Sequence, residues 1–145
     1  MFRRRDGLEL FLVHPGGPFF RNKDDGAWSI PKGEVEPSED PLVTARREFS
    51  EETGIDTPET GYVALGDVRQ KGGKRVIAWA FEGDGDPAAI AIESNTFEIE
   101  WPPRSGKRQS FPEVDRADFF SPDAARVKLN PPQAELVTRL EHALT

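Results

Sequence analysis

The clearest helical pattern in the chain lies between Asp40 and Gly54, where apolar side chains recur at spacings of three and four residues. Asp is a favoured N-cap, and the proline that follows it gives up an N–H that would be unpaired in the first turn anyway. Gly54 supplies the matching helix end. One stripe of this helix is expected to face a core, and it consists of Leu42, Ala45, Phe49 and Thr53.

Shorter apolar runs with strand character lie on both sides of this helix, separated by turn residues. The expected strands are Leu8–His14, Ala27–Ile30, Tyr62–Arg69, Lys74–Glu82, Phe97–Trp101 and Val114–Phe120. Ser121-Pro122 is a good start for a helix over Asp123–Leu129. Asn130–Gln133 repeats the device, with Gln133 as a capping-box residue, before a final amphipathic helix. Strands around one central helix, with helices at the end, predict an α/β or α+β layered domain with a mixed sheet.

Length and composition favour a single domain. The 145 residues, of which 36% are hydrophobic, suffice for one core, so we expect one domain over residues 1–145. The chain has no cysteine, which excludes disulfides, thiolate metal sites and a cysteine nucleophile. The run Leu8–Val13 is short and interrupted by Glu9, so it is neither a secretory signal core nor a membrane span. We therefore expect a soluble, cytoplasmic protein, with monomer and homodimer both open.

Negative charge is concentrated around the central helix. Of the formal net charge of −7, the segment Gly33–Ile55 carries −5, from seven carboxylates against two arginines. This balance argues against duplex nucleic acid as a partner, because nonspecific binding there depends on basic patches. Glu48, Glu51 and Glu52 stand at i, i+3 and i+4, so their carboxylates repel one another unless a cation lies between them. Such oxygen ligands suit Mg²⁺ or Mn²⁺; the alternative is a solvated acidic helix face.

The spacing within this segment is specific. Its defined positions are Gly33, Glu39, Arg47, Glu48, Phe49, Glu51, Glu52, Gly54 and Ile55. At all of them the chain resembles the signature box of the Nudix hydrolases; outside the box the resemblance is looser. The lead-in Trp28–Glu34 is similar to that of members that cleave diadenosine polyphosphates, where Trp-x-x-Pro-Lys-Gly precedes the box. The resemblance implies a Nudix fold, an α/β/α sandwich with a central mixed β-sheet and the box as a loop–helix–loop.

The resemblance also assigns roles to residues of the box. It implies that the metal ligands are Glu48, Glu52, Glu51 and the backbone carbonyl of Lys32. Arg47, in the family, holds the catalytic carboxylates in place. Glu39 is expected to stabilise the loop against the helix rather than to act in the reaction.

Many members of this family recruit a further carboxylate from a late loop, either as a ligand or as the base that takes the proton of the attacking water. Glu113 is our candidate, because its surroundings are similar to a Pro-Glu-aromatic-Asp sequence found in RNA pyrophosphohydrolase-type members. Glu98 and Glu93 are alternatives, and Asp115 is a weaker one. A solvated loop residue is the other interpretation of Glu113.

Substrate phosphates need cations, and a nucleobase needs an aromatic surface. The candidate cations are Lys32 beside the box and three residues of the expected loop Pro102–Gln109, namely Arg104, Lys107 and Arg108. The candidate aromatic residues are Phe19, Phe20 and Trp28, and His14 is a further candidate for contact with phosphate or base. Trp79 is interpreted as a core residue, as are Phe11, Phe49 and Phe81. For Trp101 the sequence leaves a place at the substrate mouth and a place capping the sheet both open.

Together these features predict a Mg²⁺-dependent Nudix hydrolase, with Mn²⁺ as a possible substitute. We expect it to split a pyrophosphate bond in a nucleoside diphosphate derivative, with a dinucleoside polyphosphate such as diadenosine tetraphosphate as the preferred small-molecule substrate. Nucleoside triphosphate sanitation and RNA 5′-pyrophosphohydrolysis are the alternatives within the enzyme class, and cleavage of inositol pyrophosphates is disfavoured by the acidic chain. A nucleotide-sensing module that does not hydrolyse is the alternative of another class.

Overall fold

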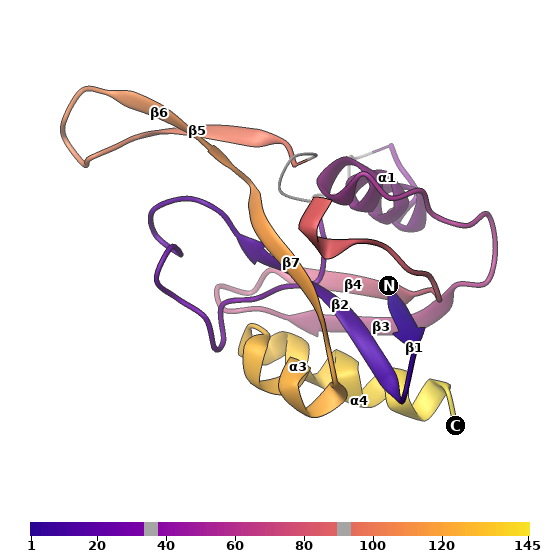
Figure 1. Ribbon diagram of the computed structural model, residues 1–145. Coiled ribbons are helices and arrows are strands. Elements are labelled where there is room, and N and C mark those ends of the chain that lie inside the picture. The colour runs from indigo at the N-terminus through magenta and orange to yellow at the C-terminus, as the bar shows by residue number, and fades with distance from the viewer. Residues whose placement is uncertain (34–37, 90–93) are drawn as a thin grey trace.

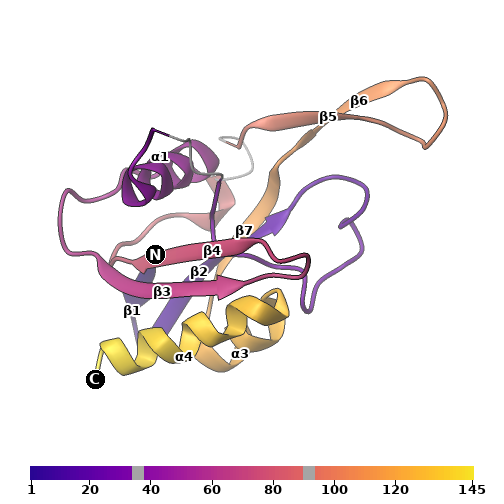
Figure 2. The same ribbon diagram turned by 180° about the vertical axis from the view of Figure 1, so that it is seen from behind.

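The computed structural model describes residues 1–33, 38–89 and 94–145, and it places helices on both sides of a layer of strands. The strands are β1 Phe2–Arg4, β2 Leu8–Pro15, β3 Val63–Arg69, β4 Arg75–Ala80, β5 Thr96–Glu100, β6 Arg108–Pro112 and β7 Val114–Phe120. The helices are α1 Pro41–Thr53, α3 Pro122–Lys128 and α4 Ala134–Ala143, with short 3₁₀ turns η1 Pro87–Ala89 and η2 Pro131–Gln133. Figures 1 and 2 show α1 on one side of the strand layer and α3 and α4 on the other. The expected α/β layering is confirmed.

Antiparallel ladders build the strand layer, and short bridges join them. The order β1-β2-β7 forms one sheet, and β3 pairs with β4 in a second. A parallel bridge joins the two sheets, because Phe2 donates to the carbonyl of Phe81 at 3.0 Å and accepts from Gly83 at 2.9 Å. The expected strand Ala27–Ile30 is reduced to isolated bridges, in which Ser29 pairs with Val13 of β2. The parallel component of the layer therefore comes from bridges rather than from full ladders.

The ends of α1 follow from local capping. The Asp40 side chain accepts a hydrogen bond from the Leu42 N–H at 2.9 Å, and Gly54 adopts a left-handed conformation with φ of 72°. In the C-terminal half of the helix, Phe49 packs its ring against Phe81, with a centroid distance of 5.1 Å. The N-terminal half differs from the prediction, because Leu42 and Ala45 are half-buried and line a cavity instead of packing into a core cluster of the described residues.

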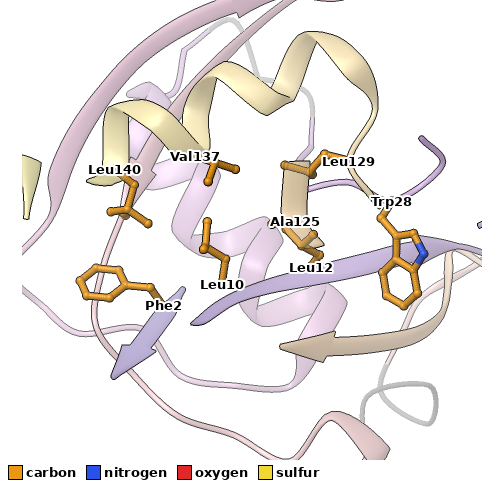
Figure 3. Packing of buried hydrophobic residues seen from close by; sticks show 9 residues of the cluster. Phe2, Leu10, Leu12, Trp28, Ala125, Leu129, Val137 and Leu140 are labelled. Carbon is orange, nitrogen blue, oxygen red and sulfur yellow. The ribbon is translucent and has the colours of Figure 1, made fainter. Parts of the chain in front are cut away.

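The main core lies between the strands and the C-terminal helices. Figure 3 shows side chains of β1 and β2 meeting those of α3 and α4. The cluster comprises Phe2, Leu10, Leu12, Trp28, Ala80, Ala125, Leu129, Val137 and Leu140. Full burial of each large apolar side chain contributes about 1.5 to 3 kcal/mol, so this cluster fixes α3 and α4 to the sheet. No helix of the described residues is long and apolar enough to span a membrane.

The start of α4 differs from the expected capping box. Asn130 makes no side-chain capping hydrogen bond, and the residues after it form the single turn η2. Gln133 is fully buried instead, and its Oε1 accepts a hydrogen bond from the Ile30 N–H at 3.0 Å. Its Nε2 donates to Oγ of Ser29 at 3.1 Å and to Oε1 of Gln70 at 2.7 Å. This amide therefore ties the start of α4 to the segment that leads into the acidic box.

The hairpin β5–β6 projects away from the rest of the molecule, as Figures 1 and 2 show. Its strands alternate, so Phe97, Ile99 and Trp101 share one face while Glu98 and Glu100 share the other. The apolar face meets the loop after β2 at Gly17, where a Cβ would lie 2.8 Å from the Phe97 ring. The loop expected over 102–109 is shorter than predicted, because its last two residues belong to β6.

Candidate active site

Glu52 is the buried carboxylate of the site. Its position near the end of α1 turns it toward the segment before the helix, and only 8% of the residue is exposed. Oε2 accepts a hydrogen bond from the Lys32 N–H at 3.3 Å. Burial raises the pKa of Glu52 to about 8, and the negative charges of Glu48 and Glu113 act in the same direction. The protein thus holds Glu52 where neighbouring groups of the chain do not offset the cost of burying its negative charge.

Glu48 lies one helical turn before Glu52 and packs directly on Gly33. A Cβ at position 33 would come within 2.1 Å of the Glu48 carboxyl carbon, so this approach requires glycine. Partial burial raises the pKa of Glu48, Arg47 opposes this effect, and the charges of Glu51 and Glu113 add to it. The two carboxylates of α1 therefore meet the backbone of the Lys32–Gly33 segment from one side.

Arg47 connects the remaining acids of the box. Its Nη2 donates to Oε1 of Glu39 at 2.9 Å, and its Nη1 donates to Oε1 of Glu48 at 3.1 Å. The same Nη1 reaches Oε2 of Glu51 at 3.4 Å. The hydrogen bond to Glu39 is the main cause of the raised pKa of Arg47. The guanidinium thus holds Glu48 in one orientation and links α1 to the loop residue Glu39, which also accepts from the Thr44 hydroxyl.

Glu113 comes to this group from a distant part of the sequence, at the junction of β6 and β7. Its N–H donates to the carbonyl of Asn95 at 2.8 Å, and its carbonyl accepts from the Gly16 N–H at 3.0 Å. Gly16 must be glycine here, because a Cβ would lie 1.9 Å from the carbonyl oxygen of Pro112. The side chain is exposed, and its charge raises the pKa of both Glu48 and Glu52, so it lies near them.

The alternatives to Glu113 lie elsewhere or outside the described residues. Glu98 lies on the polar face of the hairpin, 3.8 Å from the Arg108 guanidinium. Oδ1 of Asp115 lies 2.8 Å from Nδ1 of His14, so this carboxylate is already hydrogen-bonded to the histidine. Glu93 lies outside the described residues. Among the candidates that the structure describes, Glu113 is therefore the one whose charge acts on both helix carboxylates.

The chemistry of these donors fits a divalent cation. Glu48, Glu52 and Glu113 supply only oxygen, and their mutual repulsion is the kind that Mg²⁺ or Mn²⁺ relieves. Within residues 1–33, 38–89 and 94–145, no three acidic or histidine side chains already stand close enough together to hold an ion. The fit therefore rests on donor type and on the raised pKa values of Glu48 and Glu52.

Two of the proposed substrate contacts need correction. Trp28 is 4% exposed, its ring packs on Phe120 at a centroid distance of 5.0 Å, and its Nε1 donates to Asp24 at 2.8 Å. A base cannot stack on a ring in that position. His14 is fully buried, with Nδ1 against Asp115 and Nε2 lying 2.6 Å from the carbonyl oxygen of Lys23. Both side chains therefore belong to the packing that holds the loop after β2 in place.

The other proposed contacts gather around the projecting hairpin. Phe19 is 61% exposed, and its ring meets Trp101 edge to face at a centroid distance of 5.5 Å. Trp101 therefore lies beside the loop after β2 rather than capping the main sheet. The neighbouring ring of Phe20 lies 5.6 Å from the Lys23 ammonium. Three of the four candidate cations belong to this hairpin. Arg104 and Lys107 are exposed at its tip, and Arg108 pairs with Glu98. Figure 1 shows this tip well away from α1.

A cavity between α1 and β4 contains residues that sequence reasoning assigned differently. It has a volume of about 510 Å³ and reaches Lys32 and Gly33. Trp79, expected in the core, is half-buried and lines this cavity together with Ile77. The sequence run from Arg75 to Ala80 could have indicated this position of Trp79. It is apolar on both strand faces, so each face needs another element of the fold to cover it.

Comparisons with known proteins agree with this geometry. The NUDIX domain profile matches residues 1–140. No curated protein sequence matches the chain. Among solved structures, an Ap4A hydrolase binary complex from C. elegans aligns with a TM-score of 0.62 and 19% identity, over 99% of this chain and 92% of that chain.

Two further solved structures are similar to the same degree. The NUDIX domain of Shewanella oneidensis NrtR complexed with ADP ribose has a TM-score of 0.63 and 16% identity, over 99% of this chain and 83% of that chain. The MutT protein from Methanosarcina mazei Go1 has a TM-score of 0.58 and 19% identity, over 99% and 88%. At these identities the likeness concerns the fold alone.

Proposed function

Because the chain belongs to the Nudix hydrolase family, whose members are pyrophosphohydrolases, we propose that it cleaves a dinucleoside polyphosphate such as diadenosine tetraphosphate. The proposal covers residues 1–145 as one catalytic domain. The observation that carries it is that Glu48 and Glu52 meet the Lys32–Gly33 segment, while the charge of Glu113 raises the pKa of both. A sensing module could lose one of these acids at no cost, whereas this chain keeps them and Arg47 as well.

The family uses a divalent metal ion, and we propose Mg²⁺ in this chain. The residues that would hold it are Glu48, Glu51, Glu52, Glu113 and the carbonyl of Lys32. Such an ion neutralises the diphosphate oxygens and activates water for attack at phosphorus. Arg47 keeps Glu48 and Glu51 oriented through hydrogen bonds from Nη1, and its Nη2 is held by Glu39. The Lys32 ammonium lies on the segment beside the carboxylates, where it offers a cation to the phosphates.

Support for a substrate with two nucleosides comes from the hairpin. Phe19 and Trp101 offer exposed aromatic surface, and Arg104 and Lys107 place positive charge next to it. We propose that the second nucleoside and the distal phosphates of the substrate bind there, with Phe20 and Arg108 at the edge of the same surface. The lead-in Trp28–Lys32, similar to that of diadenosine polyphosphate hydrolases, points the same way.

A turnover screen in the presence of Mg²⁺ tests the substrate. It compares diadenosine tetraphosphate, nucleoside triphosphates, ADP-ribose and 5′-triphosphorylated RNA. The highest kcat/KM is expected for diadenosine tetraphosphate. Equal rates on all four would refute the substrate preference, and a protein that binds these compounds but cleaves none would favour nucleotide sensing.

Glu113→Gln is expected to lower kcat by about 100-fold or more, because loss of a group that moves a proton in the reaction typically costs about 10² to 10⁴-fold. The matched control is Glu98→Gln, which removes a carboxylate from the polar face of the same hairpin. The control is expected to keep the wild-type kcat. If Glu98→Gln were the inactive variant, the assignment of the late acid would move to the hairpin.

Phe19→Ala is expected to raise KM for diadenosine tetraphosphate by about 10-fold, since one base stacked on an aromatic ring contributes about 1 to 3 kcal/mol. KM for ATP, which has one nucleoside, should stay the same. Val127→Ala, which truncates another exposed apolar side chain, is the control. An equal rise in KM for both substrates would mean that Phe19 does not read the second nucleoside.

A further inference from the structure

We propose that the cavity between α1 and β4 binds the nucleobase attached to the reacting diphosphate, with Trp79 as its stacking side chain. The inference rests on the proposed function and names the part of the substrate that this cavity selects. It predicts a preference for nucleoside-bearing diphosphates over polyphosphates that lack an aromatic ring. The cavity volume of about 510 Å³ also includes space beside buried side chains of β2 and α4, such as Leu12 and Val137, and it lies in the range of about 300 to 1,000 Å³ that is usual for small-molecule sites.

The alternation of β4 turns Trp79 into the cavity. Val76, Ala78 and Ala80 are buried in the clusters that β4 shares with the C-terminal helices. Ile77 and Trp79 therefore lie on the opposite face, toward α1. Ile77 is 36% exposed, and neither side chain belongs to a core cluster of the described residues. This face of β4 is apolar, yet neighbouring side chains leave space above it.

The helix leaves that space because the apolar side chains of its first half are only half-buried. Phe49 is buried against Phe11 and Phe81, whereas Leu42 and Ala45 line the cavity as half-buried side chains. The walls are thus aliphatic and aromatic, which suits a flat, weakly polar ring better than a phosphate or a sugar.

Two of the charged side chains in the lining are already engaged. Arg46 donates to Oγ1 of Thr57 at 3.1 Å, and Arg75 donates to Oδ2 of Asp67 at 2.6 Å. The wall near these residues therefore offers less free positive charge than its composition suggests. This also agrees with a base rather than a chain of phosphates as the occupant.

The cavity and the carboxylates share one wall. Lys32 and Gly33 line the cavity, while the Lys32 N–H binds Glu52 and the Gly33 backbone packs on Glu48. A ligand with its base beside Trp79 can therefore extend past this segment toward the acids. The order base, sugar, diphosphate along the ligand matches the order cavity, Lys32, carboxylates in the protein.

Titration of the ¹⁵N-labelled protein with adenosine in metal-free buffer tests the site without any turnover. The chain has three tryptophans, and each gives one indole N–H signal, which Trp79→Phe and Trp101→Phe assign. The Trp79 signal is expected to shift saturably, and the signal of the buried Trp28 should stay in place. A shift of the Trp101 signal with none at Trp79 would place the base on the hairpin and overturn the inference.

Kinetics supply the second measurement. Trp79→Ala is expected to raise KM for ATP by about 10-fold or more with kcat nearly unchanged, and Trp79→Phe should restore most of the affinity. Val68→Ala is the matched control, because it truncates a buried side chain of the neighbouring strand β3 that does not line the cavity. It should lower stability and leave KM alone.

An equal rise in KM for Val68→Ala would overturn the inference. The failures of the two proposals are distinguishable. A wild-type protein that cleaves no pyrophosphate but shifts its Trp79 signal with adenosine would refute the proposed hydrolysis and keep the cavity. An active enzyme whose Trp79→Ala variant keeps the wild-type KM would refute the cavity as the nucleobase site and keep the proposed hydrolysis.

Discussion

Glu52→Gln is expected to lower kcat for pyrophosphate hydrolysis by more than about 100-fold. Groups that only orient metal ligands already cost about 10- to 100-fold when they are removed, and Glu52 is proposed as a ligand itself. Glutamine keeps the size of the side chain and can still accept the Lys32 N–H hydrogen bond. The loss would therefore report the missing charge rather than a cavity in the fold. Steady-state kinetics at several Mg²⁺ concentrations measure both kcat and the apparent metal affinity.

The matched control for this experiment is Glu59→Gln. Glu59 follows α1 closely, its side chain is 91% exposed, and its nearest cation is Arg46 at 3.6 Å. The substitution removes the same charge from the same region without touching the carboxylate group. Wild-type activity is expected for the control at all metal concentrations. Unchanged activity of Glu52→Gln would remove Glu52 from the metal site and leave Glu48 and Glu113 as its centre.

Local signals in the sequence predicted the elements of the fold well. Asp40, Pro41 and Gly54 fix the two ends of α1 because capping depends only on neighbours along the chain. The strand predicted over Val114–Phe120 is β7 with the same bounds. The approach of Glu48 to Gly33 also follows from the box, since both partners lie within one short segment.

Features that depend on distant partners were not predictable in the same way. Trp28 and His14 were interpreted as substrate contacts because they flank the box, but packing against Phe120 and Asp115, more than 90 residues later, buries them. The cavity beside Trp79 has the same origin. Its lining comes from elements far apart in the sequence, and no spacing along the chain records how they approach one another.

The candidate site combines residues that lie close together in the sequence with one residue that the tertiary structure brings to them. The box supplies Glu48, Glu52 and Arg47 on one helix, which the sequence specifies directly. Glu113 reaches them only because the loop at Gly16 and the start of β5 hold its backbone from two sides. Its assignment as the late acid rested on resemblance and stays a prediction, and its charge raises the pKa of Glu48 and Glu52.

The same substitution, Glu52→Gln, is expected to stabilise the metal-free protein at pH 8. The pKa of Glu52 rises from its ordinary value of 4.5 to about 8 on folding, chiefly through burial. Between these values the folded state holds a proton that the unfolded state has lost, so stability falls as pH rises through this window. Glutamine carries no charge and avoids this loss. One pKa unit corresponds to about 1.4 kcal/mol, so a shift from 4.5 to about 8 makes the gain at pH 8 on the order of 4 kcal/mol.

Urea unfolding in the presence of EDTA, at pH 4 and at pH 8, measures this effect. The variant and the wild type should be nearly equal at pH 4, where Glu52 is protonated in both states, and should diverge at pH 8. Glu59→Gln, whose carboxylate is exposed, should follow the wild type at both values. Saturating Mg²⁺ should narrow the difference at pH 8, because a cation bound to the folded wild type stabilises it by mass action. A variant no more stable than the wild type at pH 8 would mean that burial of the Glu52 charge does not destabilise the metal-free fold. The repulsion that a bound cation relieves would then come from Glu48 and Glu113.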